Sequence, residues 1–438
     1  MKLIGVFILI VFGINITLEQ ADIHNLVFKD SEATLDGQQV STTAVNGVSF
    51  NSGIVSITQS GTYTLSGTLN GQVSVSVEDK ATLILKGVTI KSTNSHGIIF
   101  LKAREIAQNG ALNPNSLSVD LDKVGASIII ADGTENTVNA AKSNDHDGAI
   151  HSCVSLLIAG ESRGDGILNV IASSEGIETD MHLFINGGII KIASQDDAIN
   201  AREDNKSIVY IKSGKLLINA GLGEEGDGID SNGYIIVEGG EIISAARAGM
   251  DSGLDSDYTN VNGGTVFALG SLLDKASDQS KQPTMNIIFT ENIAASSVLT
   301  VKDSSGKEVM SYCANEADFI SGTERKTYFA AIISHPSFKQ GGVYHLFLDG
   351  VQMGYTGNKT GFEAGFPGGV MPWGGQNQWG QNPPNQQNPW DQNQQNPWGQ
   401  NQQNPWGQNQ QNQDSQDIKT DFVLGNSATN FSGVKKAL

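Results

Sequence analysis

The amino-acid sequence predicts an all-β protein whose main part is a right-handed parallel β-helix. Two observations support this fold class. Glycine is abundant and proline is scarce, with 51 glycines against 10 prolines in 438 residues, which is typical of many tight corners between short strands. Short apolar segments also recur every 22 to 30 residues, and such a period indicates a stacking architecture. The segments between the corners are too short to contain crossover helices.

The N-terminal segment has the composition of a secretory signal peptide. Lys2 precedes an apolar stretch over residues 3–16, and polar residues follow at once. This stretch is shorter than the roughly 20 residues of a membrane-spanning helix, which makes an uncleaved anchor the less favoured alternative. We therefore expect residues 1–21 to be a signal peptide and the protein to be secreted or displayed at the cell surface. No later apolar segment is long enough to span a bilayer.

The repeat is marked by triplets of a small, an apolar and a polar residue. Five clear triplets follow one another at spacings of 27, 22, 30 and 25 residues. Double glycines run in step with them, beginning at residues 187, 239 and 263, with short strand-like segments on both sides. A propeller blade needs about 40 or more residues, so this period is too short for a propeller. The triplets begin at Ala149, Gly176, Ala198, Gly228 and Gly253.

A parallel β-helix over residues 22–280 accommodates these repeats best. Its coils would stack about 4.8 Å apart, so equivalent residues would form ladders along the molecule. The apolar middle residue of each triplet would then face the core. These inward positions are Ile150, Ile177, Ile199, Ile229 and Leu254.

The C-terminal part of the chain loses the repeat. Residues 281–365 contain longer alternating segments and predict a small antiparallel β domain that covers the end of the β-helix. Residues 366–416 are rich in Gln, Asn, Pro and Gly and have too few aliphatic residues to build a core, which predicts a low-complexity insertion. Residues 417–438 are strand-like again, and we interpret them as the closing strand of the C-terminal domain.

The five tryptophans of the protein all lie in this low-complexity insertion. Trp390, Trp398 and Trp406 are eight residues apart and are candidate carbohydrate-binding residues, because indole rings stack on sugar rings and a repeated array gains avidity. A disordered spacer and a self-associating Gln/Asn-rich matrix are the alternatives for this segment.

Acidic residues gather at one corner of the repeats. They occupy the polar position of several triplets and the two positions before it. Stacking would place carboxylates about 5 Å apart, where two unit charges repel by roughly 1 kcal/mol in water and several times more near a protein surface. A divalent cation with oxygen ligands would relieve this repulsion, and calcium is the default ion outside the cell. The candidate calcium ligands are Asp196, Asp197, Asp227, Asp230, Asp251 and Asp255.

Two alternatives compete with a calcium site. Asp and Asn are favoured at tight corners, so the aspartates could serve turn formation alone. The protein could also be a polysaccharide lyase, which would pair calcium with a strong base, and Arg202 and Arg247 are the plausible bases beside the acidic corners. Charge balance with neighbouring carboxylates explains both arginines more simply. His151 is interpreted as an ordinary polar turn residue.

The net charge limits the kinds of partner that the protein can bind, and the two cysteines raise the question of a disulfide. The net charge of −19 argues against nucleic acid and anionic membranes, and an anionic ligand would need a cation between it and the protein. Cys153 and Cys313 could form a disulfide or remain two separate thiols.

Several phrases of the sequence resemble one known family. They are "SGTYTLSGTLNGQVSVSVEDKATLILKGVTI", "IIIADGTENTV" and "DGID", and they are similar to the bacterial carbohydrate-binding domain-containing β-helix proteins, whose fold is akin to that of pectate lyases. The resemblance covers most of residues 45–360 and the closing strand. It implies a right-handed parallel β-helix with bound calcium and affinity for cellulose-like and acidic pectin-like polysaccharides, without established lyase activity.

The resemblance bears on individual residues of the acidic corner. Asp227 and Asp230 match the acidic coil motif of the family, whereas Asn200 and His151 stand where that motif has Asp. We therefore expect a secreted or surface-bound, calcium-dependent and non-catalytic protein that binds polysaccharides of the cellulose or polygalacturonate class. A calcium-dependent pectate-type lyase is one alternative, and a surface adhesin or matrix protein that acts through the tryptophan-rich insertion is another.

Overall fold

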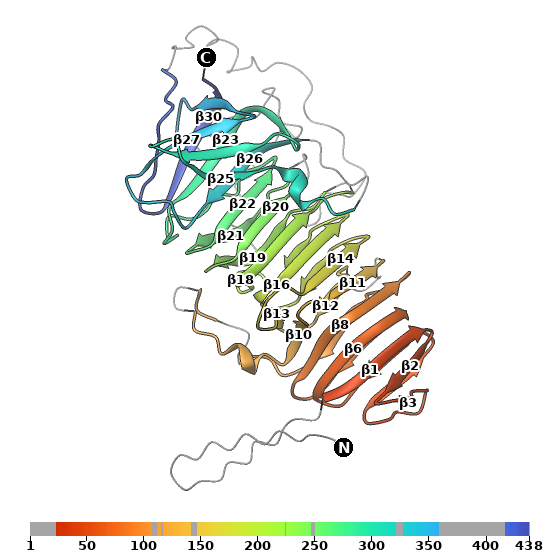
Figure 1. Cartoon of the computed structure of the whole chain (residues 1–438). Helices are drawn as coiled ribbons and strands as arrows, with labels where there is room; N and C mark the ends of the chain where they lie inside the picture. Colours follow the sequence, from red (N-terminus) through yellow and green to blue (C-terminus); the bar gives the residue numbers. More distant parts are fainter. Residues whose placement is uncertain are drawn as a thin grey trace, which may run out of the picture.

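The structure of the chain is a computed structural model in which the strands stack along one long axis and a separate group of strands lies at the C-terminal end of the stack (Figure 1). Its described residues contain no α-helix, and helical structure among them is limited to short 3-10 segments such as η3 (Leu121–Lys123) and η4 (Ala314–Ala317). The all-β prediction is confirmed. None of the described helical segments is long and apolar enough to cross a membrane. The described residues are 23–106, 112–114, 117–141, 147–223, 225–246, 250–320, 327–358 and 417–437.

Three ladders of parallel strands build the stack, and each coil of the chain contributes to all three in the middle of the molecule. The first ladder runs through β1 (Ile23–Asp30), β6 (Gly61–Asn70), β8 (Ala81–Ser92), β10 (Ala126–Ile130), β13 (Leu156–Gly160), β16 (Leu183–Ser194), β18 (Ile208–Asn219), β19 (Ile229–Val237) and β21 (Asp255–Val261). The second runs through β8, β11 (Glu135–Ala140), β14 (Ile167–Ala172), β16, β18, β20 (Glu241–Ala245) and β22 (Thr265–Gly270).

The third ladder consists of short strands and carries the triplets. It runs through β5 (Ile54–Ile57), β7 (Gln72–Ser76), β9 (Ile98–Lys102), β12 (Ile150–Ser152), β15 (Ile177–Thr179), β17 (Ile199–Ala201) and the beginnings of β19 and β21. Stacked parallel coils, as the repeat predicts, are therefore present. The right-handed sense of their winding stays a prediction.

The double glycines are the corners between the first and second ladders. Strand β16 belongs to both because its register shifts around Gly187 and Gly188, which have φ values of 111° and 80°. Most residues with a Cβ atom avoid this left-handed region, so glycine allows the strand to turn there without a break. Gly214 in β18 takes the same role, with φ of 112°.

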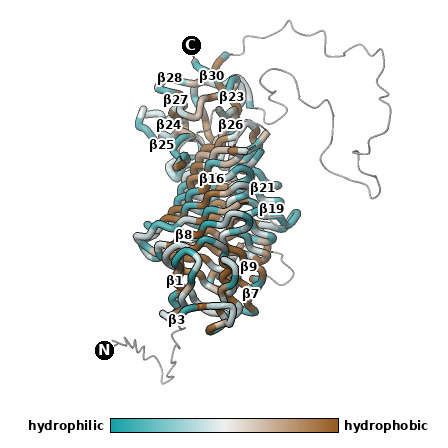
Figure 2. The backbone as a smooth tube through the Cα atoms, turned by 90° about the vertical axis from the view of Figure 1, so that its right-hand side faces the viewer, coloured by the Kyte–Doolittle hydropathy of each residue, from teal (hydrophilic) through white to brown (hydrophobic). Residues whose placement is uncertain are grey.

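The apolar triplet positions form the predicted inward ladder. Ile150 pairs with Ile177, Ile177 with Ile199, and Ile199 with Ile229, and each of these side chains is fully buried. Leu254 is also fully buried. Apolar segments recur along the whole stack in Figure 2, as expected for a core that runs the length of the molecule.

Both ends of the stack are covered. At the N-terminal end, β2 (Glu32–Leu35) folds back antiparallel onto β1 and pairs with β3 (Gln38–Gln39), and β4 (Val48–Asn51) pairs antiparallel with β5. At the other end, β26 (Thr327–Ser334) pairs antiparallel with β22. An exposed last coil would offer unpaired backbone groups to another chain, and β26 occupies the groups of β22.

The C-terminal strands form a second core against the last coils. Strand β23 (Thr284–Ala294) pairs antiparallel with β26 and parallel with the closing strand β30 (Ala428–Lys436). A smaller antiparallel group beside it is built from β24 (Leu299–Asp303), β25 (Glu308–Tyr312), β27 (Val343–Leu348), β28 (Val351–Gly354) and β29 (Phe422–Val423). The expected signal peptide and the low-complexity insertion lie outside the described residues.

Candidate functional site

The polar triplet residues form one continuous row on the third ladder. Successive residues of a strand point to opposite faces, so the residue after each buried isoleucine points away from the core. The register places these residues directly above one another in consecutive coils, as the triplet spacing predicts. The row is His151, Glu178, Asn200, Asp230 and Asp255.

A second acidic row lies at the corner just before the triplets, and backbone amides of neighbouring coils hold its carboxylates. The backbone N–H of Asp227 donates to the Oδ1 atom of Asp197 at 2.6 Å, and the N–H of Ser252 donates to the Oδ1 atom of Asp227. Asn200 donates through Nδ2 to the Oε1 atom of Glu175 at 3.0 Å, which joins the two rows. We use the name acidic edge for seven carboxylate residues drawn from the two rows, namely Glu175, Asp196, Asp197, Asp227, Asp230, Asp251 and Asp255.

Burial and mutual repulsion raise the pKa values along the acidic edge. Burial raises the pKa of Asp227 to about 9, with help from the charges of Asp255, Asp197 and Asp230. The same causes, burial first, raise the pKa of Asp197 to about 8 and that of Asp230 to about 7. The carboxylates therefore retain protons near neutral pH, or need a cation to ionise together.

Two buried oxygen atoms at the N-terminal end of the acidic edge have no hydrogen-bond partner among the described residues. They are Oε2 of Glu175, a residue only 8% exposed, and Oδ1 of Asn200. Burial, followed by the charge of Glu178, raises the pKa of Glu175 to about 9. A buried polar atom without a partner is costly, and a bound cation would satisfy the oxygen atoms.

All six aspartates expected from sequence lie on this edge. Asp196 and Asp251 are close enough to Asp197 for their charges to raise its pKa, after the larger effects of burial and Asp230. The carbonyl of Asp251 accepts hydrogen bonds from the backbone of Ser271 and Leu272 at 2.9 and 3.1 Å. The set is thus brought together, but no three of its carboxylates have oxygen atoms within 4.8 Å of one another in the described residues. An ion here would complete its coordination with water or ligand oxygens.

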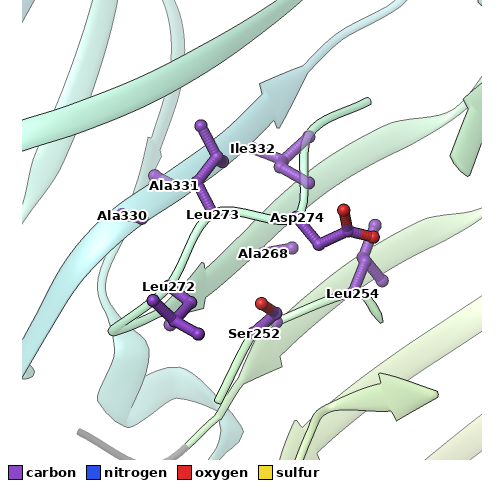
Figure 3. A pocket seen from close by; sticks show the side chains of 11 residues that line it. Ser252, Leu254, Ala268, Leu272, Leu273, Asp274, Ala330, Ala331 and Ile332 are labelled. Carbon is purple, nitrogen blue, oxygen red and sulfur yellow. The ribbon is translucent and has the colours of Figure 1, made fainter. Parts of the chain in front are cut away.

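Asp274 extends the acidic edge and is not evident from the repeat. It lies in a small pocket between the last coil and β26, with Leu254 and Ile332 among its neighbours (Figure 3). Its Oδ2 atom accepts a hydrogen bond from the backbone N–H of Ser256 at 2.8 Å. Burial, and then the charge of Asp255, raises the pKa of Asp274 to about 7. Because Asp274 follows the last repeat, no sequence periodicity points to it.

A stacked aromatic pair, which the repeat does not predict, lies on the first ladder, beyond the register shift that follows Ser231 in β19. Tyr234 and Tyr258 pair in the strands β19 and β21, which also pair Asp230 with Asp255. Their rings are stacked, with centroids 5.4 Å apart and planes 16° apart, and Tyr258 is 49% exposed. The sequence does contain a signal for this pair, because a tyrosine follows the triplet aspartate by three or four residues in both coils. The predicted carbohydrate-binding residues Trp390, Trp398 and Trp406 lie outside the described residues.

Arg202 is engaged as a counter-ion. Its Nη1 atom lies 2.6 Å from Oε1 of Glu178, whose side chain is almost fully buried, and 3.9 Å from Oδ1 of Asp180. Burial alone would lower the pKa of Arg202, but Glu178 and Asp180 raise it above its usual value. A guanidinium held in its charged form is a poor base, which favours the charge-balance interpretation. Arg247 lies outside the described residues.

The two cysteines remain separate thiols. Cys153 directly follows β12 in the stack, and Cys313 directly precedes η4 in the C-terminal part, and both are free.

Comparison with known proteins adds a curated relative and a solved structure. A carbohydrate-binding domain-containing protein of Acetivibrio thermocellus is 29% identical over 171 residues, which cover 37% of this chain and 53% of the relative. The chain thus spans about half the length of this curated relative. A structure titled as a polysaccharide lyase-like protein from C. thermocellum, gadolinium derivative, aligns with 59% of this chain and 92% of that chain, with a TM-score of 0.42 and 23% identity.

A family model gives the broader assignment. The model described as carbohydrate-binding domain-containing protein matches residues 51–317, which include the whole acidic edge and the Tyr234–Tyr258 pair. The matched region is more than half of the 438 residues. This chain therefore belongs to the family of carbohydrate-binding domain-containing proteins.

Proposed function

We propose that this protein binds polysaccharides through calcium held on the acidic edge. The observation that supports this proposal most directly is the stack of carboxylates whose pKa values are raised first by burial and then by the charges of their neighbours. Such a stack is unfavourable in the ionised protein alone. It becomes favourable when a divalent cation enters, because the ion attracts all the carboxylates at once.

Calcium fits the donor set better than other common ions. The acidic edge offers carboxylate, amide and carbonyl oxygens, which are the ligands of hard cations. Magnesium requires near-ideal octahedral geometry, whereas calcium accepts six to eight oxygens in flexible arrangements. The spacing of about 4.8 Å between coils suits a larger ion that bridges two coils. Asp197, Asp227 and Asp230 are the ligands we expect to matter most, because neighbouring coils already orient Asp197 and Asp227.

Calcium would also supply the link to an acidic glycan. A protein with a net charge of −19 repels a polyuronate unless cations lie between them. An ion that is only partly coordinated by the protein can accept uronate oxygens at its open positions. We therefore propose acidic, pectin-like polysaccharides as the preferred ligands, with cellulose-like glycans as the alternative.

The Tyr234–Tyr258 pair would provide the apolar part of the binding surface. A sugar ring has apolar C–H faces that pack on aromatic rings, and Tyr258 exposes about half of its surface. Because the two tyrosines share strands with Asp230 and Asp255, a glycan chain could contact the ion and the aromatic rings together. This surface does not require the tryptophan-rich insertion.

We propose that the protein acts outside the cell and without catalysis. The signal-peptide composition of residues 1–21 supports secretion, and the counter-ion role of Arg202 counts against a lyase that uses it as a base. The winding of the stack should be right-handed, since parallel strands joined within one sheet are connected that way in nearly all proteins.

Binding of the purified protein to insoluble cellulose and to polygalacturonate, each with calcium and with EDTA, tests this function. We expect retention on polygalacturonate that calcium supports and EDTA abolishes, with no increase in the ultraviolet absorbance of unsaturated uronides. Retention that is the same with calcium and with EDTA would contradict the role of calcium. Rising absorbance would identify a lyase instead.

A further inference from the structure

A different set of ligand-type side chains lies on the third ladder, just before the acidic edge. His151 in β12, Cys153 directly after β12 and Asp180 directly after β15 face one another across two neighbouring coils. The Nε2 atom of His151 lies 3.5 Å from Sγ of Cys153 and 3.7 Å from Oδ1 of Asp180. In the described part of the chain, these three side chains form the one set of three or more His, Cys, Asp or Glu residues whose ligand atoms all lie within 4.8 Å of one another.

The stacking of the coils brings this set together. His151 lies in β12 and Cys153 at the bend directly after it, and their side chains face each other. The register pairs His151 with Glu178, and the N–H of Asp180 donates to the carbonyl of Ser152 at 2.9 Å, which places Asp180 beside Cys153. The set is therefore fixed by backbone pairing rather than by a flexible loop.

Glu178 determines which nitrogen of His151 faces the sulfur. Its Oε2 atom accepts hydrogen bonds from Nδ1 of His151 at 2.9 Å and from the N–H groups of Asp147 and Gly148 at 2.9 and 2.8 Å. Its other oxygen, Oε1, lies 2.6 Å from Nη1 of Arg202. A carboxylate that accepts from two backbone N–H groups and pairs with a guanidinium also accepts from the imidazole, so Nδ1 carries the proton. In the neutral imidazole, Nε2 then directs its lone pair toward Cys153 and Asp180.

This arrangement matches the surroundings of a metal-bound histidine. Ligating histidines commonly donate their other ring N–H to a carboxylate, which orients the ring. With Zn–N of about 2.0–2.1 Å and Zn–S of about 2.3 Å, the N···S edge of a tetrahedral site is about 3.5 Å. The observed separation of His151 and Cys153 equals that edge, and Oδ1 of Asp180 lies within a few tenths of an ångström of the corresponding N···O distance from His151.

A thiol nucleophile activated by His151 is the competing interpretation. The Cys153–His151–Glu178 sequence of contacts has the form of a catalytic triad. Asp180 opposes it, because a carboxylate beside the sulfur disfavours a thiolate. The same carboxylate would attract a metal ion, which favours a cation over a thiolate nucleophile at this point.

We propose that His151, Cys153 and Asp180 bind a divalent transition-metal ion of the zinc type, with Glu178 orienting the imidazole. Nitrogen and sulfur donors select such ions over calcium, which prefers oxygen alone. The Asp180 side chain is 36% exposed, so an ion can reach the site from solvent, and a water molecule or a ligand atom can take the fourth position. The site is separate in chemistry from the calcium site of the proposed function and does not depend on it.

Cobalt(II) is a suitable probe because cobalt–thiolate bonds give a charge-transfer absorption that calcium and protein oxygens do not. The reduced, metal-free full chain should bind one cobalt ion with this absorption, and zinc should displace it. Cys153→Ser should abolish the absorption, whereas Cys313→Ser, which removes the other thiol, should leave it unchanged. Glu178→Gln should weaken cobalt binding by about 10- to 100-fold, as expected for loss of an orienting carboxylate.

The folded state of each variant can be checked by its melting transition without metal. Asp227→Asn, on the acidic edge, should leave the cobalt absorption intact, which separates this site from the calcium site. The proposal is overturned if the wild-type protein shows no cobalt–thiolate absorption, or if Cys153→Ser retains it. Rapid, stoichiometric alkylation of Cys153 without any cobalt binding would overturn it in favour of a thiol nucleophile.

Discussion

The carboxylate of Asp197 accepts a hydrogen bond of 2.6 Å from the backbone N–H of Asp227, one coil further along the stack. The side chain of one coil is thus held by the backbone of the next. Because Asp227 is held in the same way by Ser252, the carboxylates keep their positions even while their charges repel one another. The acidic edge is therefore preorganised for a cation by the same register that stacks the isoleucine core.

Asp227→Asn should remove most of the calcium response without unfolding the protein. The amide has the shape of the protonated acid and can still accept from Ser252, but it contributes no charge to the ion. At calcium concentrations 100 times its Kd, the wild-type protein should gain about 2.7 kcal/mol of stability, and the variant should lose that gain. Melting curves with calcium and with EDTA measure the difference. Glu308→Gln, at an exposed carboxylate of the C-terminal domain, is the control and should respond like the wild type.

The stability of the calcium-free protein should fall as pH rises from about 4 to about 9. Glu175, Asp197 and Asp227 have folded-state pKa values of about 9, 8 and 9, above their ordinary values of 4.5, 3.8 and 3.8. The folded state therefore binds more protons than the unfolded state in this window. For each extra proton that the folded state binds, the free energy of unfolding falls by about 1.4 kcal/mol for every pH unit by which the pH rises.

Melting temperatures in EDTA across this pH range measure the effect. Calcium should flatten the dependence, because the ion replaces the protons. A stability that rises with pH in EDTA would show that the acidic edge does not govern the titration.

Tyr258→Ala should weaken polysaccharide binding several-fold and leave calcium binding unchanged. The ring supplies stacking area of the kind worth about 0.5–1.5 kcal/mol, but it offers no ligand to the ion. Tyr258→Phe retains the ring and is the matched control. Retention assays with calcium present give the glycan affinity, and calcium titration followed by melting temperature gives the ion affinity. Equal loss of glycan binding in both variants would point to the hydroxyl group rather than to stacking.

Deletion of residues 366–416 should leave calcium-dependent retention intact. The acidic edge and the Tyr234–Tyr258 pair lie wholly outside this segment, so the proposed surface does not need Trp390, Trp398 or Trp406. Retention of the shortened chain on polygalacturonate is the measurement. Loss of binding with an unchanged melting temperature would favour the adhesin or matrix-protein interpretation.

Ile199→Ala should destabilise the stack by about 2–5 kcal/mol, because Ile199 is fully buried between Ile177 and Ile229. Val351→Ala, at a side chain that is 42% exposed, should change the stability by no more than about 0.5 kcal/mol. Thermal unfolding of the two variants in EDTA compares them without any contribution from calcium.

The sequence predicted those features that repeat with the coils. The triplets place one residue inward and the next outward, and this alternation is a property of any extended strand, so the register of Ile177, Ile199 and Ile229 was predictable. The aspartates of the acidic edge followed for the same reason. The number of aspartates that would bind one calcium ion was not predictable, because the directions of side chains at a corner depend on local backbone contacts.

Contacts between segments that do not follow the repeat could not be predicted from the sequence. Asp274 joins the acidic edge only because the segment after β22 packs back onto the last coil. Cys153 and Asp180 meet because one coil has a particular length, which aligns the ends of β12 and β15. The two-residue separation of His151 and Cys153 was visible in the sequence, but their third partner was set by stacking.

The pairing of β26 with β22 also ends the stack, and so limits the length of the surface that we propose for glycan binding. Each coil that carries the acidic edge adds one step of about 4.8 Å to this proposed surface, so a polymer bound along it would gain one more point of attachment per coil. Because strands close both ends, duplication or loss of a central coil would change the valency of the surface without exposing a new edge. On the proposed function, the number of coils, rather than the strength of any single contact, would therefore set the avidity for a long polysaccharide.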